Sequence, residues 1–214
     1  LNGTCGAINA AHLVDGFMRS RAVDLAMIVA GDVDPGASRG FTFGRSGAAM
    51  LLRWDAGEAG FQGFHFKTFP EYQDLFQSAI GWEAARGTRL PFQSAGENLL
   101  EVVERPGYLE RSVDCAVSTA REFLAGHGMT SSAVDVLVAA HTSPAFPELL
   151  ANRLGIPGSA LVHVATALQH AHTALPIAAL AEADRGGRLT AAHQVLVVTA
   201  GAGITVGLAL YRGA

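Results

Sequence analysis

The segment QVLVVTAGAGITVGLALYRG, residues 194–213, carries the strongest fold signal in the chain. Two apolar runs flank a glycine-rich bend, which is the pattern of two buried strands joined by a turn. A stretch with helical spacing, residues 172–185, leads into the segment through the small-residue turn RGGRL. The sequence therefore predicts a helix followed by a pair of strands at this end of the chain.

The same order of elements occurs near the beginning of the chain. A helical pattern over residues 5–19 leads through a basic turn into DLAMIVAGD (24–32), an apolar run typical of a strand buried on both faces, and then into GRSGAAMLLRW (44–54). The strand endings LLRW and ALYR correspond. We interpret the two stretches as copies of one unit related by a pseudo-two-fold axis, with functional sites where the copies meet.

Strands and helices alternate over the rest of the chain, which indicates a layered α/β architecture. An irregular region that could cover a site is expected over residues 71–104. Further strands are expected at 60–69, 134–141 and 160–165, and further helices at 111–129 and 143–157.

The composition excludes several classes of protein. Half of the 214 residues are hydrophobic, 16% are charged and the formal net charge is −4, so the basic surface of a nucleic-acid binder is missing. The two cysteines lie far apart and suggest neither a disulfide framework nor a thiolate metal site, which fits a cytoplasmic setting. No apolar run is long enough to span a bilayer, so no membrane association is expected.

Cys5 is the first candidate for chemistry. It lies among small residues directly before the first predicted helix, where the positive end of the helix dipole favours a thiolate and lowers the pKa of the thiol. The residues alone leave two alternatives open, a nucleophile and a small buried core residue.

Three histidines could act with such a thiol. His141 ends a predicted buried strand, at the edge where α/β sheets present ligand-binding groups. His170 and His172, in LQHAHT, lie at the start of the helix that matches the one after Cys5. An HxH pair can bind a metal, but no carboxylate or cysteine stands nearby to complete the ligand shell, so no metal is expected.

The glycine-rich bend at Gly201, Ala202 and Gly203 is followed by a strand pattern, so it fails the test for a dinucleotide-binding loop, which leads into a helix. A turn that shapes an acyl or oxyanion pocket suits the pattern better.

Cys5, the distal histidines and the closing strand pair together resemble the thiolase-fold condensing enzymes, most closely the β-ketoacyl-ACP synthase III group. TCGAINAAHLVDGFM is similar to the family's nucleophile helix and FTFGRSGAAMLL to its glycine-alanine strand. The stretch from His141 to residue 213 is similar to the run from the family's catalytic histidine to its closing hairpin. The resemblance implies a layered αβαβα fold with internal duplication. Residues 1–105 would be the remainder of the N-terminal half and 106–214 the C-terminal half.

The resemblance also implies roles for residues. Cys5 would accept the acyl group and His141 would be the first active-site histidine. Gly201, Ala202 and Gly203 would line the site and contribute to an oxyanion hole with the backbone of Cys5. At the position of the family's asparagine this chain has His170, with His172 as the nearby alternative.

The resemblance implies an acyltransferase that uses acyl-CoA or acyl-carrier-protein thioesters, without a cofactor, in a Claisen-type condensation of fatty-acid or polyketide-like biosynthesis. Phe146 stands where the family often has a basic residue for carrier-protein docking, and Arg45 replaces an acidic residue, so the sequence departs from the family's pattern at both places. Transfer to an oxygen or nitrogen acceptor and a non-catalytic partner subunit of a ketosynthase are the alternatives, with a metal-dependent hydrolase as a more distant one.

The family has strands and helices before the nucleophile that have no counterpart in this sequence. We therefore expect a further polypeptide or fragment to supply that portion, and the resemblance implies that the complete subunit forms a homodimer.

Overall fold

The computed structural model describes residues 3–32, 36–39, 44–83 and 97–213. Its central element is a four-stranded sheet in the order β4 (Gly60–Thr68), β9 (Thr205–Arg212), β8 (Val195–Gly201), β7 (Val136–Ala140). β7 and β8 are parallel and the other neighbours are antiparallel. All residues of β7 and β8 are buried, since helices cover both faces of the sheet, as the continuous apolar runs predicted.

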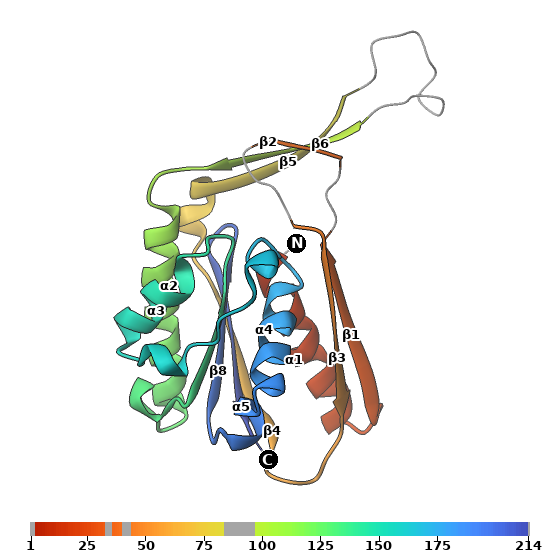
Figure 1. The fold of residues 1–214 in the computed structure, drawn as a ribbon, viewed down its shortest axis with the longest axis vertical. Helices are drawn as coiled ribbons and strands as arrows, with labels where there is room; N and C mark the ends of the chain where they lie inside the picture. The colour runs from red at the N-terminus through yellow and green to blue at the C-terminus, as the bar shows by residue number, and fades with distance from the viewer. Residues whose placement is uncertain (1–2, 33–35, 40–43, 84–96, 214) are drawn as a thin grey trace.

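The elements stack in four layers (Figure 1). α2 (Tyr108–Gly126) and α3 (Phe146–Leu154) cover one face of the four-stranded sheet. α1 (Gly6–Arg19) and α4 (Leu175–Arg185) lie on its other face, and the antiparallel pair β1 (Leu25–Asp32) and β3 (Ser46–Arg53) packs against these two helices. The layered α/β fold is therefore confirmed, with a sheet as the outermost layer on the β1–β3 side of the described chain.

The internal duplication is visible in this arrangement. α1 leads into the antiparallel pair β1 and β3, and α4, followed by the short α5 (Arg188–Ala191), leads into the antiparallel pair β8 and β9. α1 and α4 lie side by side between the two sheets (Figure 1). The beginnings of both helices consequently meet at the same end of the molecule.

β1 differs from its prediction. Every second residue of this strand is exposed, and Leu25, Met27 and Val29 present a row of apolar side chains to solvent. The sequence predicted a strand buried on both faces, and this is wrong for the described chain, because only the face toward α1 is covered.

The region 71–104 is more regular than its sequence suggested. A 3₁₀ helix, Pro70–Leu75, leads into β5 (Phe76–Glu83), which pairs with β6 (Glu97–Glu104), and β2 (Gly36–Arg39) adds to the other side of β6. This arm extends beyond the layered body (Figure 1). The segment 84–96 lies outside the described residues.

The structure bears on the strand expected at 160–165 and on the division of the chain at residue 105. The strand expected at 160–165 is reduced to a single bridge between Leu161 and Leu137. β4 falls within the predicted first half, 1–105, yet it pairs with β9 of the second half. The central sheet therefore contains strands from both predicted halves. The division of the chain into halves stays a prediction.

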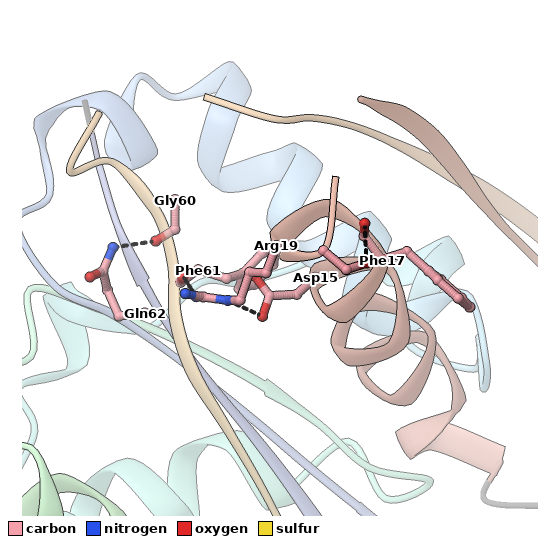
Figure 2. A network of polar contacts seen from close by, with 7 residues as sticks. Asp15, Phe17, Arg19, Gly60, Phe61 and Gln62 are labelled. Carbon is pink, nitrogen blue, oxygen red and sulfur yellow. Dashed lines mark hydrogen bonds and ion pairs between the residues drawn. The ribbon is translucent and has the colours of Figure 1, made fainter. Parts of the chain in front are cut away.

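Side-chain contacts tie the C-terminal end of α1 to β4 (Figure 2). Arg19 forms an ion pair with Asp15 at 2.7 Å and donates a hydrogen bond to the carbonyl of Phe61 at 3.4 Å. Gln62 is the next residue of β4, and its side-chain amide donates a hydrogen bond to the carbonyl of Gly60 at 3.1 Å. The helix that begins next to Cys5 is therefore held at its far end by β4, the edge strand of the central sheet.

Candidate active site

Cys5 ends a short 3₁₀ helix, Gly3–Cys5, and is the N-cap residue of α1. Its sulfur is fully buried between the ends of β8 and β9. The Sγ atom lies 3.3 Å from the carbonyl oxygen of Thr205 and 3.7 Å from that of Thr199. The hydroxyl of Thr199 donates to Sγ at 3.2 Å, so both strands that flank the glycine-rich turn contact the thiol.

The acidity of the thiol differs from its prediction. Burial raises the pKa of Cys5 to about 11, although hydrogen bonds from the Thr199 hydroxyl and from the backbone of Gly207 act in the lowering direction. The position at the start of α1 is as expected, but the prediction of a lowered pKa is wrong, because the sulfur is excluded from water and faces two carbonyl oxygens. The resting thiol is therefore protonated.

His141 follows β7 directly and is buried together with the residues around it. Its ring stacks on Phe146 with a centroid distance of 4.7 Å and lies 5.1 Å from the ring of Tyr108. The backbone N–H of Ser143 donates to Nδ1 at 2.9 Å, which leaves the proton of the neutral imidazole on Nε2.

The protonation state of His141 follows from its burial. Exclusion from water lowers the pKa of His141 to about 3, and the nearby charge of His172 acts in the same direction. Nε2 is buried and has no hydrogen-bond partner within the described part of the chain. At neutral pH His141 therefore offers an N–H donor that nothing else in the described site uses.

The structure separates the two histidines of LQHAHT. The ring of His172 packs against Gly3, two residues before Cys5, so closely that a Cβ atom on Gly3 would overlap the imidazole. Burial also lowers the pKa of His172. His170 has an exposed side chain, and its carbonyl accepts the backbone N–H of Gly44 at 2.9 Å. Of the two, His172 is the one that the structure brings beside the Cys5 turn and within electrostatic range of His141.

The glycine-rich turn connects β8 to β9 next to Cys5. Gly201 is the last residue of β8 and is buried, while Ala202 is exposed and Gly203 adopts a positive φ of 68° that suits glycine. Thr199 and Thr205, which contact the sulfur, stand on either side of this turn. The turn thus lies between the two residues that contact the thiol.

Two residues of the site were not anticipated from the sequence. Asp32, the last residue of β1, is buried and accepts backbone N–H groups from the loop that carries His172. Its signal was an acidic residue closing an otherwise apolar strand. Tyr108 begins α2, is fully buried between Phe76 and His141, and gives no comparable signal in the sequence. Burial raises its pKa far above the usual value, and the nearby Glu104 and Cys5 add to the rise.

The described residues contain no group of three or more His, Cys, Asp or Glu side chains that could hold a metal ion. Nor do the described helices include one that is both long and apolar enough to cross a membrane.

Comparisons with known proteins agree with this geometry. Residues 124–213 match the family model described as "3-Oxoacyl-[acyl-carrier-protein (ACP)] synthase III C terminal". A β-ketoacyl-[acyl-carrier-protein] synthase III of Rhodospirillum rubrum is 29% identical over 186 residues, which cover 79% of this chain and 51% of that protein. The chain thus spans about half the length of this curated relative.

Solved structures show the same fold. The 3-oxoacyl-[acyl-carrier-protein] synthase III of Aquifex aeolicus gives a TM-score of 0.76 at 18% identity, covering 98% of this chain and 65% of that one. The enzyme of Pseudomonas aeruginosa gives 0.76 at 20% identity, covering 99% and 65%. The chain therefore has the thiolase fold of the 3-oxoacyl-ACP synthase III enzymes, and its residues 124–213 are similar to the C-terminal part of that family.

Proposed function

We propose that the chain carries the active site of an acyltransferase of the β-ketoacyl synthase III type. In this proposal Cys5 accepts an acyl group from an acyl-CoA or acyl-carrier-protein thioester, and the acyl group is then condensed with a malonyl-type extender. The relatives named above are synthases that act with an acyl carrier protein, as their names state. The single observation that favours condensation is the state of His141.

A neutral His141 suits one chemical role better than another. With a pKa of about 3 it is a poor general base at neutral pH, which argues against activation of an alcohol or amine acceptor. Its unused, buried Nε2–H is suited to donate a hydrogen bond to the thioester carbonyl of an extender, where negative charge develops as carbon dioxide leaves. Because His172 is also held in its neutral form by burial, it can assist in the same way.

The proposed reaction has two steps, acylation of Cys5 and condensation with the extender. The Cys5 sulfur forms a bond to the acyl carbonyl carbon, the bond to the donor sulfur breaks, and the thiol proton passes to the departing thiolate. The extender then loses carbon dioxide, and the electron pair of the broken C–C bond forms a new C–C bond to the acyl carbon. The Cys5 sulfur leaves as a thiolate and takes a proton from water. Backbone N–H groups of Cys5 and of the turn Gly201, Ala202 and Gly203 would stabilise the oxyanion in both transfers.

Release of carbon dioxide distinguishes condensation from transfer to oxygen or nitrogen. The protein, purified with any polypeptide that accompanies it, would be supplied with an acyl-CoA and a malonyl thioester labelled in its free carboxyl group. The proposal expects labelled carbon dioxide that requires both Cys5 and His141, and none from Cys5→Ala. Acylated alcohol or amine without carbon dioxide would overturn condensation in favour of the alternative transfer.

We further propose that a companion segment covers the outer face of β1. Met27 and Val29 are 65% and 68% exposed, and β1 pairs with β3 alone among the described strands, so one edge of β1 remains open. The chain covers only 51–65% of its relatives, which leaves a portion of those proteins with no counterpart here. A polypeptide corresponding to that portion would supply the missing layer.

The proposal extends to the cofactor requirement, the oligomeric state and the cellular setting. The reaction needs no cofactor beyond the thioester substrates, the complete subunit would form a homodimer, and the setting would be the cytoplasm.

A further inference from the structure

The loop that precedes α4 is fastened to the opposite half of the duplicated fold through one carboxylate. Oδ2 of Asp32 accepts the backbone N–H of His172 at 2.9 Å and that of Ala174 at 3.0 Å, while Oδ1 accepts the N–H of Thr173 at 2.8 Å. Hydrogen bonds from three consecutive N–H groups to an ionised acceptor fix the backbone strongly, because each is charge-assisted.

The carboxylate is itself held in place. The hydroxyl of Ser46 donates to Oδ2 of Asp32 at 3.1 Å, and the two residues stand opposite each other in the β1–β3 register. Two residues before Ser46, the N–H of Gly44 donates to the carbonyl of His170 at 2.9 Å. The end of β1 and the residues that lead into β3 therefore hold the loop at two separate points, on either side of Ala171.

We propose that Asp32 is a positioning residue that sets the place of the His172 imidazole relative to Cys5 and His141. This inference rests on the proposed function and deepens it. Asp32 does not touch the reacting atoms: it fixes the backbone of residue 172, and the backbone in turn seats the ring against Gly3 at the Cys5 turn. The condensation step, which uses the histidines, depends on this position of the His172 ring. Acylation of Cys5 does not.

The charges around His172 give the proposal a distinctive signature. Burial lowers the pKa of His172, and the Asp32 carboxylate raises it part of the way back. At the end of β7, the pKa of His141 is in turn lowered by the charge of His172, and the 3₁₀ helix Gly3–Cys5 contributes Cys5 but no acidic or basic side chain. Loss of the Asp32 charge should therefore lower the pKa of His172, in addition to loosening the loop.

The test compares Asp32→Asn with Ser46→Ala in the protein purified with any accompanying polypeptide. Ser46→Ala removes one hydrogen bond to Oδ2 but keeps the carboxylate and its three backbone partners, so it is the matched control. Two rates are followed separately: acylation of Cys5, by intact mass, and decay of the acyl-enzyme with a malonyl thioester, from pH 5 to 9.

The expected result is a split between the two steps. Asp32→Asn should acylate at the wild-type rate, lose on the order of tenfold to a hundredfold in the second step, and move the acid limb of that step to lower pH. Ser46→Ala should retain the acylation rate and the pH profile, and should slow the second step far less than Asp32→Asn does. Equal loss in both steps, or an unchanged acid limb, would show that Asp32 only supports the fold and would overturn the proposal.

A second variant guards against misfolding. Asp32→Glu keeps the charge and lengthens the side chain by one methylene, so the second step should slow while its acid limb stays in place. Amide hydrogen exchange at residues 172–174 reports the hold of the carboxylate without any activity, and should accelerate in Asp32→Asn. If the wild type forms no acyl-enzyme at all, the proposed function fails, whereas unchanged exchange at these amides rejects the role of Asp32.

Discussion

The hydroxyl of Thr199 lies 3.2 Å from the sulfur of Cys5, although the two residues are 194 positions apart. Thr199 stands near the end of β8 and Cys5 at the beginning of α1, so this contact joins the first described helix to the last strand pair. The same hydroxyl lies 3.1 Å from the carbonyl of Gly207 and can donate to either acceptor. The environment of the thiol is thus made by both copies of the duplicated unit.

Thr199→Val should make Cys5 less reactive. The substitution keeps the shape of the side chain but removes the hydroxyl that lowers the pKa of the thiol, so the pKa of Cys5 should rise above about 11. Loss of one hydrogen bond worth about 1 kcal/mol corresponds to about a fivefold slower alkylation by iodoacetamide at pH 9. Cys115, which is also buried but lies on α2, is the internal control. An unchanged alkylation rate at Cys5 would contradict the assigned contact.

His141→Phe should separate packing from chemistry. The phenyl ring can keep the stack between Tyr108 and Phe146 while the Nε2–H donor is lost. We expect acylation of Cys5 to persist, release of carbon dioxide to disappear, and the free energy of unfolding at pH 7 to change by no more than about 2 kcal/mol, because a buried unpaired N–H and one backbone hydrogen bond are lost together.

The same variant should change the acid sensitivity of the fold. The pKa of His141 is about 3 when folded, so below the ordinary histidine pKa the unfolded chain binds a proton that the folded chain does not. Stability should therefore fall as the pH drops from about 6.5 toward 3, by about 1.4 kcal/mol per pH unit for this group. His172 acts in the same direction, and Asp32, whose pKa is lowered by its three N–H partners despite burial, adds a loss below about pH 4. Urea unfolding of His141→Phe across this range should show a shallower slope; an identical slope would be inconsistent with a buried neutral His141.

Gly3→Ala should displace His172. The φ angle of Gly3 is +38°, and a Cβ atom there would overlap the His172 ring, so the variant is strained and the imidazole must move. The second transfer should slow by at least tenfold, by analogy with misplacement of other positioning groups. Gly6→Ala, at the first residue of α1, is the matched control, because its Cβ would only make an ordinary 3.5 Å contact with the side chain of Thr173. Equal activity of the two variants would argue against a role for His172.

Met27→Lys should release the companion segment. Met27 is 65% exposed, so the substitution should change the folding free energy of this chain by less than about 0.5 kcal/mol. A lysine on the outer face of β1 would, however, be buried without a partner once that face is covered. Light scattering of the purified protein should show loss of the companion from Met27→Lys and not from Leu149→Lys, a control 41% exposed on α3. A wild-type chain that is folded, monomeric and alone would contradict the proposed companion.

The sequence predicted those parts of the fold that depend on local pattern. The duplicated helix and strand pairs, the position of Cys5 before α1 and that of His141 after β7 all follow from apolar periodicity and from the glycine-rich turn. β5 and β6 were missed because the arm they form does not rest on the layered body for most of its length, and so lacks the apolar alternation of a core strand (Figure 1).

Features that depend on long-range contacts were not predictable. The raised pKa of Cys5 comes from burial of the sulfur at the ends of β8 and β9, and no local pattern places these strands next to residue 5. The placement of His172 next to the Cys5 turn depends on the loop that Asp32 holds, across 140 residues of sequence. The family resemblance places His170 at the position of the asparagine, because a match of sequence positions cannot show how the loop before the helix turns.

The central claim is that Cys5 forms an acyl-enzyme. Intact mass and peptide mapping of the protein, purified with any companion, after brief exposure to a panel of acyl-CoA thioesters test it most directly. The account predicts a single acyl increment on the peptide containing Cys5, retained in Cys115→Ala and absent from Cys5→Ala. An increment that survives in Cys5→Ala, or none from any thioester while the companion is present, would contradict it and favour a non-catalytic subunit.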